Sequence, residues 1–284
     1  MTARVVVVGS LNHDITVWVP RRPNPDETLH GDRIAEFRGG KGANQAVAAA
    51  RLEADVSMVG AVGADARGTF LLDGLDAEGI DHSLVDRVDT PTGVALITVD
   101  PTDVSIIVVA GANGTVGEDV ANAACDSIAA ADVLLLQGEI PAAAARRAAQ
   151  IAREHRTLVV FNPAPVNEVA AAVLELTDVL VVNRGEAASI GPVDTDLVVT
   201  TLGAEGCVVS ENGYATRIEP FEADMVDPTG AGDCFVAALA VSLAEGSEPV
   251  DAARFASAAG SLAVESEGAQ PSLPSRSAVE ARLG

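Results

Sequence analysis

Lysine is almost absent from this sequence of 284 residues: Lys41 is the only one, and the other basic residues are arginines. With 41 acidic residues against 18 basic ones, the formal net charge is −23. A protein that binds a nucleic-acid backbone needs a basic patch, so we expect no nucleic-acid partner. The acids are spread along the chain instead of gathered in a tail. This pattern indicates a halophilic protein, whose self-repulsion concentrated salt would screen.

Aromatic residues, cysteines and long apolar runs are also scarce. Aromatics make up 3% of the chain, so the core must come from Val, Leu, Ile and Ala. The three cysteines, at 125, 207 and 234, are odd in number and far apart, which favours neither a disulfide framework nor a metal site. No apolar run reaches the ~18 residues of a membrane span. The first residues are typical of a strand and not of a signal peptide. We therefore expect a cytoplasmic protein with no membrane partner.

Short β-branched runs alternate with alanine-rich runs along most of the chain. Strands are expected at 5–8, 57–62, 133–137, 158–162, 179–183 and 197–202, and helices at 44–52, 116–130, 142–155 and 168–176. Continuous apolar strands are typical of a buried parallel sheet. The alternation therefore predicts an α/β fold, a doubly wound and mainly parallel sheet with helices on both faces.

Two stretches break this alternation. Residues 15–37 are strand-like but contain three prolines, and residues 94–100 and 105–110 predict a hairpin. Together they would form a small β-sheet that projects as a lid. An exposed sheet has to be covered, by ligand, by the main domain or by a second subunit. We expect one domain over 1–284, with a lid from about residues 13–38 and 92–110 and a homodimer formed through it.

The segment Asp227-Pro-Thr-Gly-Ala-Gly-Asp233 places carboxylates at both ends of a turn of small residues, and an apolar helical run follows at 234–243. The start of a helix offers unpaired N–H groups and the positive end of the dipole, so it binds anions. An acid there would repel a phosphate unless it acts as a base, taking the proton of a hydroxyl that attacks the phosphoryl group. The segment predicts phosphoryl transfer.

A second glycine-rich turn, Gly39-Gly-Lys-Gly-Ala-Asn44, opens a helix. It is not a Walker loop, and by itself it would be a tight turn with a helix cap. The only lysine of the chain lies in it, which favours contacts to a polyhydroxylated ligand. Polar residues also follow several expected strands, at 9–14, 137–139, 162, 183 and 201–203. Ligands of open α/β sheets bind at the carboxyl ends of strands, so one crevice is expected there.

The Gly39–Asn44 turn, followed by Gln45-Ala-Val-Ala-Ala, and the Asp227–Asp233 turn resemble the two signatures of the ribokinase family of carbohydrate kinases. Gly9–Asp14 and Gly268–Ser272 resemble the same family, and the resemblance runs from Val5 to the end of the sequence. It implies a Rossmann-like domain with a β-sheet lid over a sugar. It also implies transfer of the γ-phosphate of ATP to a sugar hydroxyl, most simply from D-ribose to D-ribose 5-phosphate.

The resemblance also implies roles for individual residues. Asp233 matches the catalytic base, and Gly230, Ala231 and Gly232 match a backbone anion hole. The sugar contacts carry over to Asn12, Asp14, Gly40, Lys41, Gly42, Ala43, Asn44, Glu139 and Asp233.

Nucleotide and cation contacts are implied in the same way. The ATP contacts are Asn183, Thr201, Leu202, Gly203, Ala204, Glu205, Gly206, Gly232, Asp233 and Ser257. Mg²⁺ would be held through water by Glu186, and an activating K⁺ by Asp227, Thr229, Ala263, Ser266, Gly268 and Ser272. From their spacing alone, Asn183 and Glu186 equally fit a capping box at the start of a helix.

The sequence departs from the family between Glu186 and Leu197, where residues 187–196 are too few for a helix and a connection. Because this segment would lie on the nucleotide side of the sheet, we expect its shortness to affect ATP affinity and the choice of nucleotide. Alternative substrates are 2-deoxyribose, fructose, 2-keto-3-deoxygluconate or a nucleoside, although the shortage of large aromatics near the lid disfavours a stacked base. A catalytically silent sugar-binding regulator is the alternative from another class, and the intact Asp233 disfavours it.

Overall fold

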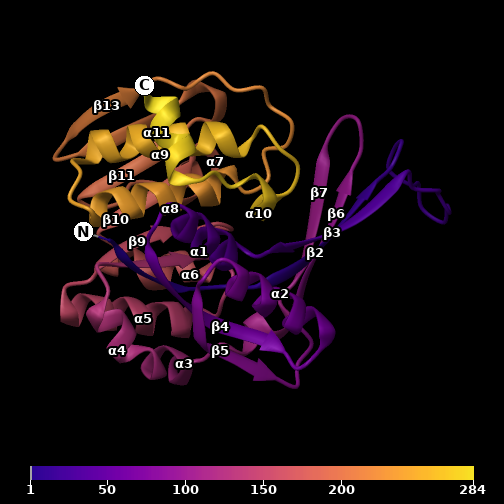
Figure 1. Ribbon diagram of the computed structural model, residues 1–284, viewed down its shortest axis with the longest axis horizontal. Coiled ribbons are helices and arrows are strands. Elements are labelled where there is room, and N and C mark those ends of the chain that lie inside the picture. The colour runs from indigo at the N-terminus through magenta and orange to yellow at the C-terminus, as the bar shows by residue number, and fades with distance from the viewer. Residues whose placement is uncertain (1) are drawn as a thin grey trace.

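The computed structural model describes residues 2–284 and contains two sheets (Figure 1). The strands of the larger one are β1 (Arg4–Val8), β4 (Asp55–Gly63), β5 (Asp81–Val88), β8 (Val133–Gln137), β9 (Leu158–Asn162), β10 (Val179–Asn183), β11 (Leu197–Thr201), β12 (Cys207–Glu211) and β13 (Tyr214–Ile218). Their order is β13-β12-β11-β10-β9-β8-β1-β4-β5. Neighbours from β5 to β11 are parallel, and only β12 and β13 pair antiparallel. The predicted α/β class and mainly parallel sheet are confirmed.

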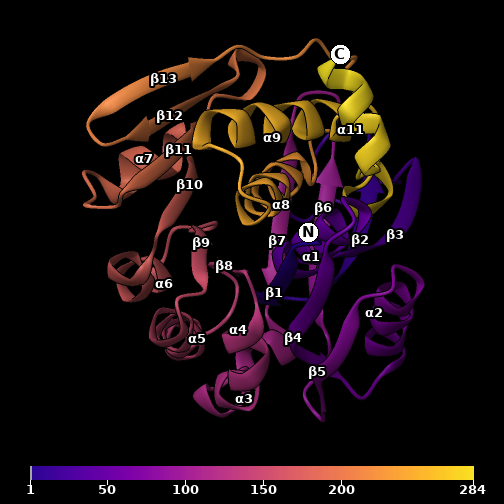
Figure 2. The same cartoon turned by 60° about the vertical axis from the view of Figure 1, so that its left-hand side comes forward.

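Helices cover both faces of this sheet (Figure 2). One layer holds α1 (Lys41–Arg51), α8 (Ala231–Ala244), α9 (Pro249–Ala263) and α11 (Arg276–Leu283), and the other holds α3 (Glu118–Ala123), α4 (Cys125–Ala130), α5 (Ala142–His155) and α6 (Glu168–Val173). Successive strand residues point to opposite faces. In β1, accordingly, Val5 and Val7 belong to the core under α1 and α8, while Val6 and Val8 belong to the core under α5.

Shorter elements complete the chain: α2 (Ala66–Ala77), α7 (Arg184–Ile190), α10 (Ala269–Ser272), and the 3-10 helices η1 (Gly111–Thr115), η2 (Leu174–Leu176) and η3 (Gly203–Glu205). One prediction needs correction. Residues 116–130 form two helices, α3 and α4, which both pack against α5. The short segment 187–196 holds only the end of α7, which starts at Arg184 and ends at Ile190, and a connection to β11 without a further helix.

The smaller sheet projects from the body of the molecule (Figure 1). It consists of β3 (Arg33–Gly39), β2 (Asn12–Trp18), β6 (Gly93–Val99) and β7 (Val104–Val109), in that order. β2 and β3 lie within residues 12–39 and β6 and β7 within residues 93–109, each within one residue of a segment predicted for the lid. Because β2 follows β1 almost at once, it carries polar residues from the carboxyl edge of the large sheet into the lid. That the chain forms a single domain stays a prediction.

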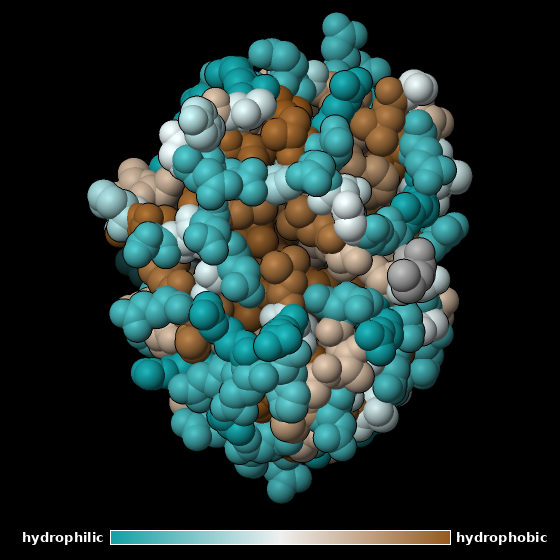
Figure 3. Space-filling model, turned by 90° about the vertical axis from the view of Figure 1, so that its left-hand side faces the viewer, coloured by the Kyte–Doolittle hydropathy of each residue, from teal (hydrophilic) through white to brown (hydrophobic). Residues whose placement is uncertain are grey.

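The face opposite the lid carries hydrophilic residues around a hollowed, apolar middle (Figure 3). It lies at the end of the large sheet where β1 begins (Figure 1), away from the edge that meets the lid. Within residues 2–284, no helix has the length and apolar character needed to cross a membrane.

Candidate active site

Asp233 lies in the first turn of α8, which begins immediately after Gly230. Gly230 has a φ of 82°, and a Cβ there would lie 2.9 Å from the Cα of Ala269, so the position requires glycine. A Cβ on Gly232, in contrast, would meet no heavy atom of residues 2–284 within 4 Å. The helix start is therefore tightly fixed on one side and open to a ligand on the other.

The predicted anion hole at this helix start is partly occupied by the protein itself. The N–H of Ala231 donates to the carbonyl of Pro228 at 3.2 Å. The N–H groups of Gly232 and Asp233 belong to the first turn, where a helix supplies no internal acceptor. Of the predicted anion-hole amides, that of Ala231 therefore already has an acceptor, and anion binding at this helix start stays a prediction.

The carboxylate of Asp233 is buried, with 5% of the residue exposed, and side-chain amides bind both of its oxygens. Asn44 donates from Nδ2 to Oδ2 at 2.9 Å, and Gln45 donates from Nε2 to Oδ1 at 3.2 Å. Both amides come from α1, which packs against α8. The two glycine-rich turns, far apart in sequence, thus meet at Asp233.

Lys41 and Glu139 extend this cluster. The backbone N–H of Lys41 donates to Glu139 Oε2 at 3.1 Å, and the hydroxyl of Ser10 donates to the same oxygen. Negative charge on Asp233, and then on Glu139 and Glu186, raises the pKa of the Lys41 ammonium. The only lysine of the chain is thus held charged among the predicted catalytic, sugar and magnesium carboxylates.

Asp14 is buried in the same cluster. Burial, together with the negative charges of Glu139 and Asp233 and against the opposing charge of Lys41, raises the pKa of its carboxyl to about 7. Its Oδ1 has no hydrogen-bond partner among the described residues. A Cβ on Gly39 would lie 2.0 Å from its Oδ2, so this glycine makes room for the carboxylate. A buried oxygen without a partner is costly, and a ligand hydroxyl is the natural donor for it.

Asn12 is fixed by Asn113 of η1. Asn113 donates from Nδ2 to Asn12 Oδ1 at 2.8 Å, and its own Oδ1 accepts from the N–H of Leu11 at 2.9 Å. Since the oxygen of Asn12 already has this donor, its amide nitrogen is the group left for a sugar oxygen.

The glycine-rich turn packs closely against the end of β1. Gly40 has a φ of 88°, and a Cβ there would lie 2.7 Å from the backbone nitrogen of Asn12. The N–H of Ala43 donates to the carbonyl of Ser10 at 2.9 Å, and that of Gly42 to its hydroxyl at 3.4 Å. Gly42 and Ala43, both predicted as sugar contacts, therefore support the site through Ser10.

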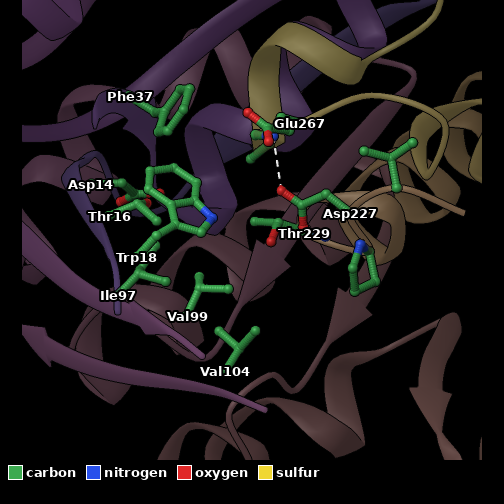
Figure 4. Close-up of a pocket in the computed structure, with 14 residues that line it drawn as sticks. Asp14, Thr16, Trp18, Phe37, Ile97, Val99, Val104, Asp227, Thr229 and Glu267 are labelled. Carbon is green, nitrogen blue, oxygen red and sulfur yellow. Dashed lines mark hydrogen bonds between the residues drawn. The ribbon is translucent and has the colours of Figure 1, made fainter. Parts of the chain in front are cut away.

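A cavity lies between the lid and the body (Figure 4). Its lid wall holds Asp14, Thr16, Trp18, Phe37, Ile97, Val99 and Val104, and its body wall holds Val226–Thr229 and Glu267–Ala269. Asp14 belongs to both the cavity and the carboxylate cluster. The statement that large aromatics are lacking near the lid is wrong, because the single tryptophan of the chain and Phe37 both line this space.

The predicted nucleotide residues lie along β10, β11 and α9. Asn183 and Glu186 form a complete capping box: Asn183 accepts from the N–H of Glu186 at 2.9 Å, and Glu186 accepts from the N–H of Asn183 at 2.8 Å. The structural interpretation of this pair is therefore confirmed. Its assignment to ATP and Mg²⁺ stays a prediction.

The turn at 201–206 contains η3, and its Glu205 is paired with Arg184 at 2.7 Å. A Cβ on Gly206 would lie 2.1 Å from the carbonyl oxygen of Ile218. Ser257 of α9 donates to the carbonyl of Ala253 at 2.9 Å. These side chains therefore have partners within the protein.

The predicted K⁺ residues come from two segments that meet at Asp227. Asp227 Oδ1 accepts from the N–H of Thr229 at 2.9 Å, and Oδ2 accepts from the N–H of Gly268 at 2.9 Å (Figure 4). Ser272 is buried and Ala263 is fully buried, whereas Ser266 is exposed. The structure brings both segments together, with one backbone N–H bound to each oxygen of Asp227, and the assignment to K⁺ stays a prediction.

A model of the pfkB family of carbohydrate kinases matches residues 2–276. The chain belongs to this family. It is similar to a ribokinase of Bacillus subtilis, 38% identical and covering 98% of this chain and 99% of the relative. A ribokinase of Haemophilus influenzae is 36% identical, with 97% of each chain covered.

Solved structures give the same result. A ribokinase from Thermotoga maritima matches with a TM-score of 0.90 and 32% identity over 99% of both chains. Arabidopsis thaliana ribokinase complexed with ribose and ATP matches with a TM-score of 0.91 and 32% identity, covering 100% of this chain and 99% of the other. The predicted family and its fold, including the small second sheet, are confirmed.

Three residues of the site were not among the site residues predicted from the sequence: Gln45, Gln137 and Asn113. Gln45 directly follows the Gly39–Asn44 turn, and Gln137 is the polar end of a strand, so position gave a signal for both. Asn113 lies in a turn and bonds to residues about a hundred positions away, which no local pattern reveals.

Proposed function

We propose that the protein is an ATP-dependent sugar kinase that transfers the γ-phosphate of ATP to the 5-hydroxyl of D-ribose, giving D-ribose 5-phosphate and ADP. The observation that carries this proposal is the cluster in which Asp233, at the start of α8, faces Asn44, Lys41 and Asp14. The full-length similarity to ribokinases, one of them complexed with ribose and ATP, supports it.

In this proposal, Asp233 removes the proton of the sugar hydroxyl as its oxygen attacks the γ-phosphorus. The new oxygen–phosphorus bond forms while the bond to the β-phosphate oxygen breaks, and ADP leaves with that electron pair. The N–H groups of Gly232 and Asp233 then stabilise the developing charge of the transferred group. The ammonium of Lys41 adds positive charge close by.

The sugar would be oriented by residues that have unused hydrogen-bonding capacity. Asp14 Oδ1 and Asn44 Oδ1 are both buried without a partner in the described chain. Each can accept from a sugar hydroxyl, and Glu139 and the amide nitrogen of Asn12 can bind its neighbours. This donor and acceptor set matches a small polyol.

ATP would lie across the carboxyl edge of β10 and β11, along Asn183, the 201–206 turn and Ser257. Mg²⁺ fits beside Glu186, a carboxylate close enough to Lys41 to raise the pKa of that ammonium. Mg²⁺ keeps several waters and takes few protein ligands, so a single carboxylate suffices. When bound, it offsets the charge of the phosphates.

K⁺ fits the meeting point of residues 227–229 and 263–272, because that site offers hard oxygen donors. Both oxygens of Asp227 hold backbone N–H groups, so this carboxylate would shape the loop while carbonyls contact the ion. Binding there would stabilise the segment that precedes α8. We propose activation by K⁺ on this ground.

A homodimer through the lid is also proposed. Strand β7 is the edge of the small sheet, and Ile106, Ile107, Val108 and Val109 are each about half exposed on it. Exposed apolar edge strands are liable to pair with another chain. We also propose a cytoplasmic location, because the sequence has no pattern of a membrane span or signal peptide, and adaptation to salt, because its net charge is −23.

The test is consumption of ATP, measured in a coupled assay with Mg²⁺ and K⁺ over a panel of D-ribose, 2-deoxyribose, fructose, 2-keto-3-deoxygluconate and adenosine. We expect the highest kcat/KM with D-ribose. Preference for the nucleoside would assign Trp18 and Phe37 to a base instead. No turnover of any sugar, combined with measurable binding of ribose, would support the silent regulator.

A further inference from the structure

A chain of three buried side chains leads from the end of β8 to Asp233. Gln137 donates from Nε2 to Gln45 Oε1 at 2.7 Å, and Gln45 donates from Nε2 to Asp233 Oδ1 at 3.2 Å. Gln45 is fully buried and Gln137 is 1% exposed. The three residues come from three different elements, β8, α1 and α8. Burying two uncharged amides in an apolar interior is costly unless they are hydrogen-bonded, and these two bonds offset part of that cost.

Gln45 restrains the rotation of the Asp233 carboxylate. Asn44 holds one oxygen and Gln45 holds the other, so the carboxylate plane is fixed at two points. Each carboxylate oxygen has further acceptor capacity, so Oδ2 can still receive a sugar hydroxyl beside Asn44. A base has to be within hydrogen-bond reach of the proton that it removes, and small misplacements are expensive in rate.

Gln137 decides which way the amide of Gln45 points. An amide can rotate by half a turn, and in the other orientation Gln45 would present its oxygen to the carboxylate, where like partial charges repel. Because Gln137 donates to Gln45 Oε1, it favours the orientation in which Nε2 faces Asp233. Gln137 therefore acts on the base through Gln45 without touching it.

Gly9 gives Gln137 the room to do this. A Cβ at this position would lie 2.1 Å from Gln137 Oε1. That oxygen is also buried with no hydrogen-bond partner in the described part of the chain. The amide of Gln137 is thus oriented by its bond to Gln45, although its own oxygen stays unsatisfied.

We propose that Gln45 and Gln137 are positioning residues that hold the Asp233 carboxylate in its reactive orientation through a directed chain of two hydrogen bonds. This rests on the function proposed above. This pair of hydrogen bonds predicts that Gln137 affects the rate only through Gln45, and that Gln45 affects it only through the position of Asp233.

The test uses the full-length variants Gln45→Met, Gln137→Met and the double variant. Methionine keeps the length of the side chain but cannot donate. We expect kcat to fall roughly 10- to 100-fold in each single variant, while KM for sugar and for ATP changes less than about threefold. The double variant should be no slower than Gln45→Met, since both act through one group.

Thr157→Val is the control, because it removes another buried hydrogen bond, to Ile128, away from the site. It should lower the melting temperature and leave kcat unchanged.

Gln137→Glu separates orientation from packing. A carboxylate at 137 would attract the amide nitrogen of Gln45 and turn its oxygen toward Asp233. We expect kcat below that of Gln137→Met. Folded single variants with wild-type kcat, or a double variant slowed by the product of the two single effects, would overturn the proposal.

A wild-type protein that phosphorylates no sugar would instead overturn the proposed function. The positioning role of Gln45 is then tested with crystal structures of the wild type and of Gln45→Met, which do not depend on turnover. We expect the Asp233 carboxylate to rotate away from its wild-type position in the variant. An unmoved carboxylate would count against the positioning role.

Discussion

Arg33 of the lid binds Glu267 of the body, with its Nη2 at 3.0 Å and 2.9 Å from the two carboxylate oxygens. The same guanidinium lies 3.6 Å above the ring of Trp18, which lines the cavity between the lid and the body. Glu267 immediately precedes Gly268, whose N–H binds Asp227. One pair therefore connects the lid to the loop in which we place K⁺.

Removal of this pair should weaken sugar binding more than it weakens the fold. Exposed ion pairs contribute up to about 1 kcal/mol, so Arg33→Ala should weaken the attachment of the lid to the body by a similar amount. We expect the Kd for ribose to rise roughly two- to fivefold, because the lid forms one wall of the cavity. Calorimetric titration measures it. Arg21→Ala is the control, since Arg21 pairs with Glu27 inside the lid, and an equal loss of affinity there would refute the link.

Replacement of the base should separate chemistry from binding. Asp233→Asn keeps the shape of the side chain but cannot accept a proton, so kcat should fall roughly 10²- to 10⁴-fold. The Kd for ribose should stay within about fivefold, because Asp14, Asn44 and Glu139 remain. Asp224→Asn removes an exposed aspartate as the matched control. Wild-type turnover in Asp233→Asn would rule out the role as base.

Asp14 should make the free protein less stable as the pH rises. Its folded-state pKa of about 7 lies above the ordinary 3.8, so between these values the folded protein keeps a proton that the unfolded chain has released. The free energy of unfolding therefore falls with rising pH through this window, by up to about 4 kcal/mol for this group.

Asp14→Asn should remove this dependence. We expect the variant to be more stable than the wild type near pH 8, roughly equal near pH 4, and to bind ribose about tenfold or more weakly. Urea denaturation at both pH values and titration with ribose measure the two effects. Equal pH slopes for the two proteins would show that Asp14 ionises as freely in the fold as in the unfolded chain.

Salt should act on this protein in two distinguishable ways. The net charge of −23 opposes the compact state, so the thermal midpoint should rise as KCl increases from about 0.1 M to about 2 M. NaCl should give the same rise, since screening does not depend on the cation. The rate at fixed ionic strength should instead increase only with K⁺. A midpoint that falls with salt would exclude the halophilic interpretation, and a rate indifferent to K⁺ would exclude the cation site.

Six strands of the large sheet and the two glycine-rich turns could be predicted because their signals are local, whereas β5, β12 and β13 were not expected. Val133–Gln137 is a continuous apolar run, and the structure has a strand over the same residues. The capping box at Asn183 is equally local, since its two hydrogen bonds join residues three positions apart. This capping box starts α7, whose last residues occupy the first part of the short segment 187–196.

The inner arrangement of the site could not be predicted, because its contacts join distant residues. Gln45 meets Gln137 across 92 positions, and Asn44 meets Asp233 across 189. The pattern of one sequence shows that such residues are polar but not which partner each one has. Trp18 and Phe37 lie within the segment 13–38 expected for the lid, but only the structure shows that both line the cavity.

The position of Lys41 gives this protein a built-in chemical reporter. As the chain holds a single lysine, a reagent that acylates primary amines can modify only one side chain, and that side chain lies among Asp233, Glu139 and Glu186. Because these carboxylates raise the pKa of the ammonium and only the neutral amine reacts, the labelling requires alkaline pH. Mass spectrometry of the labelled peptide would then follow occupation of the crevice directly, without any need for turnover.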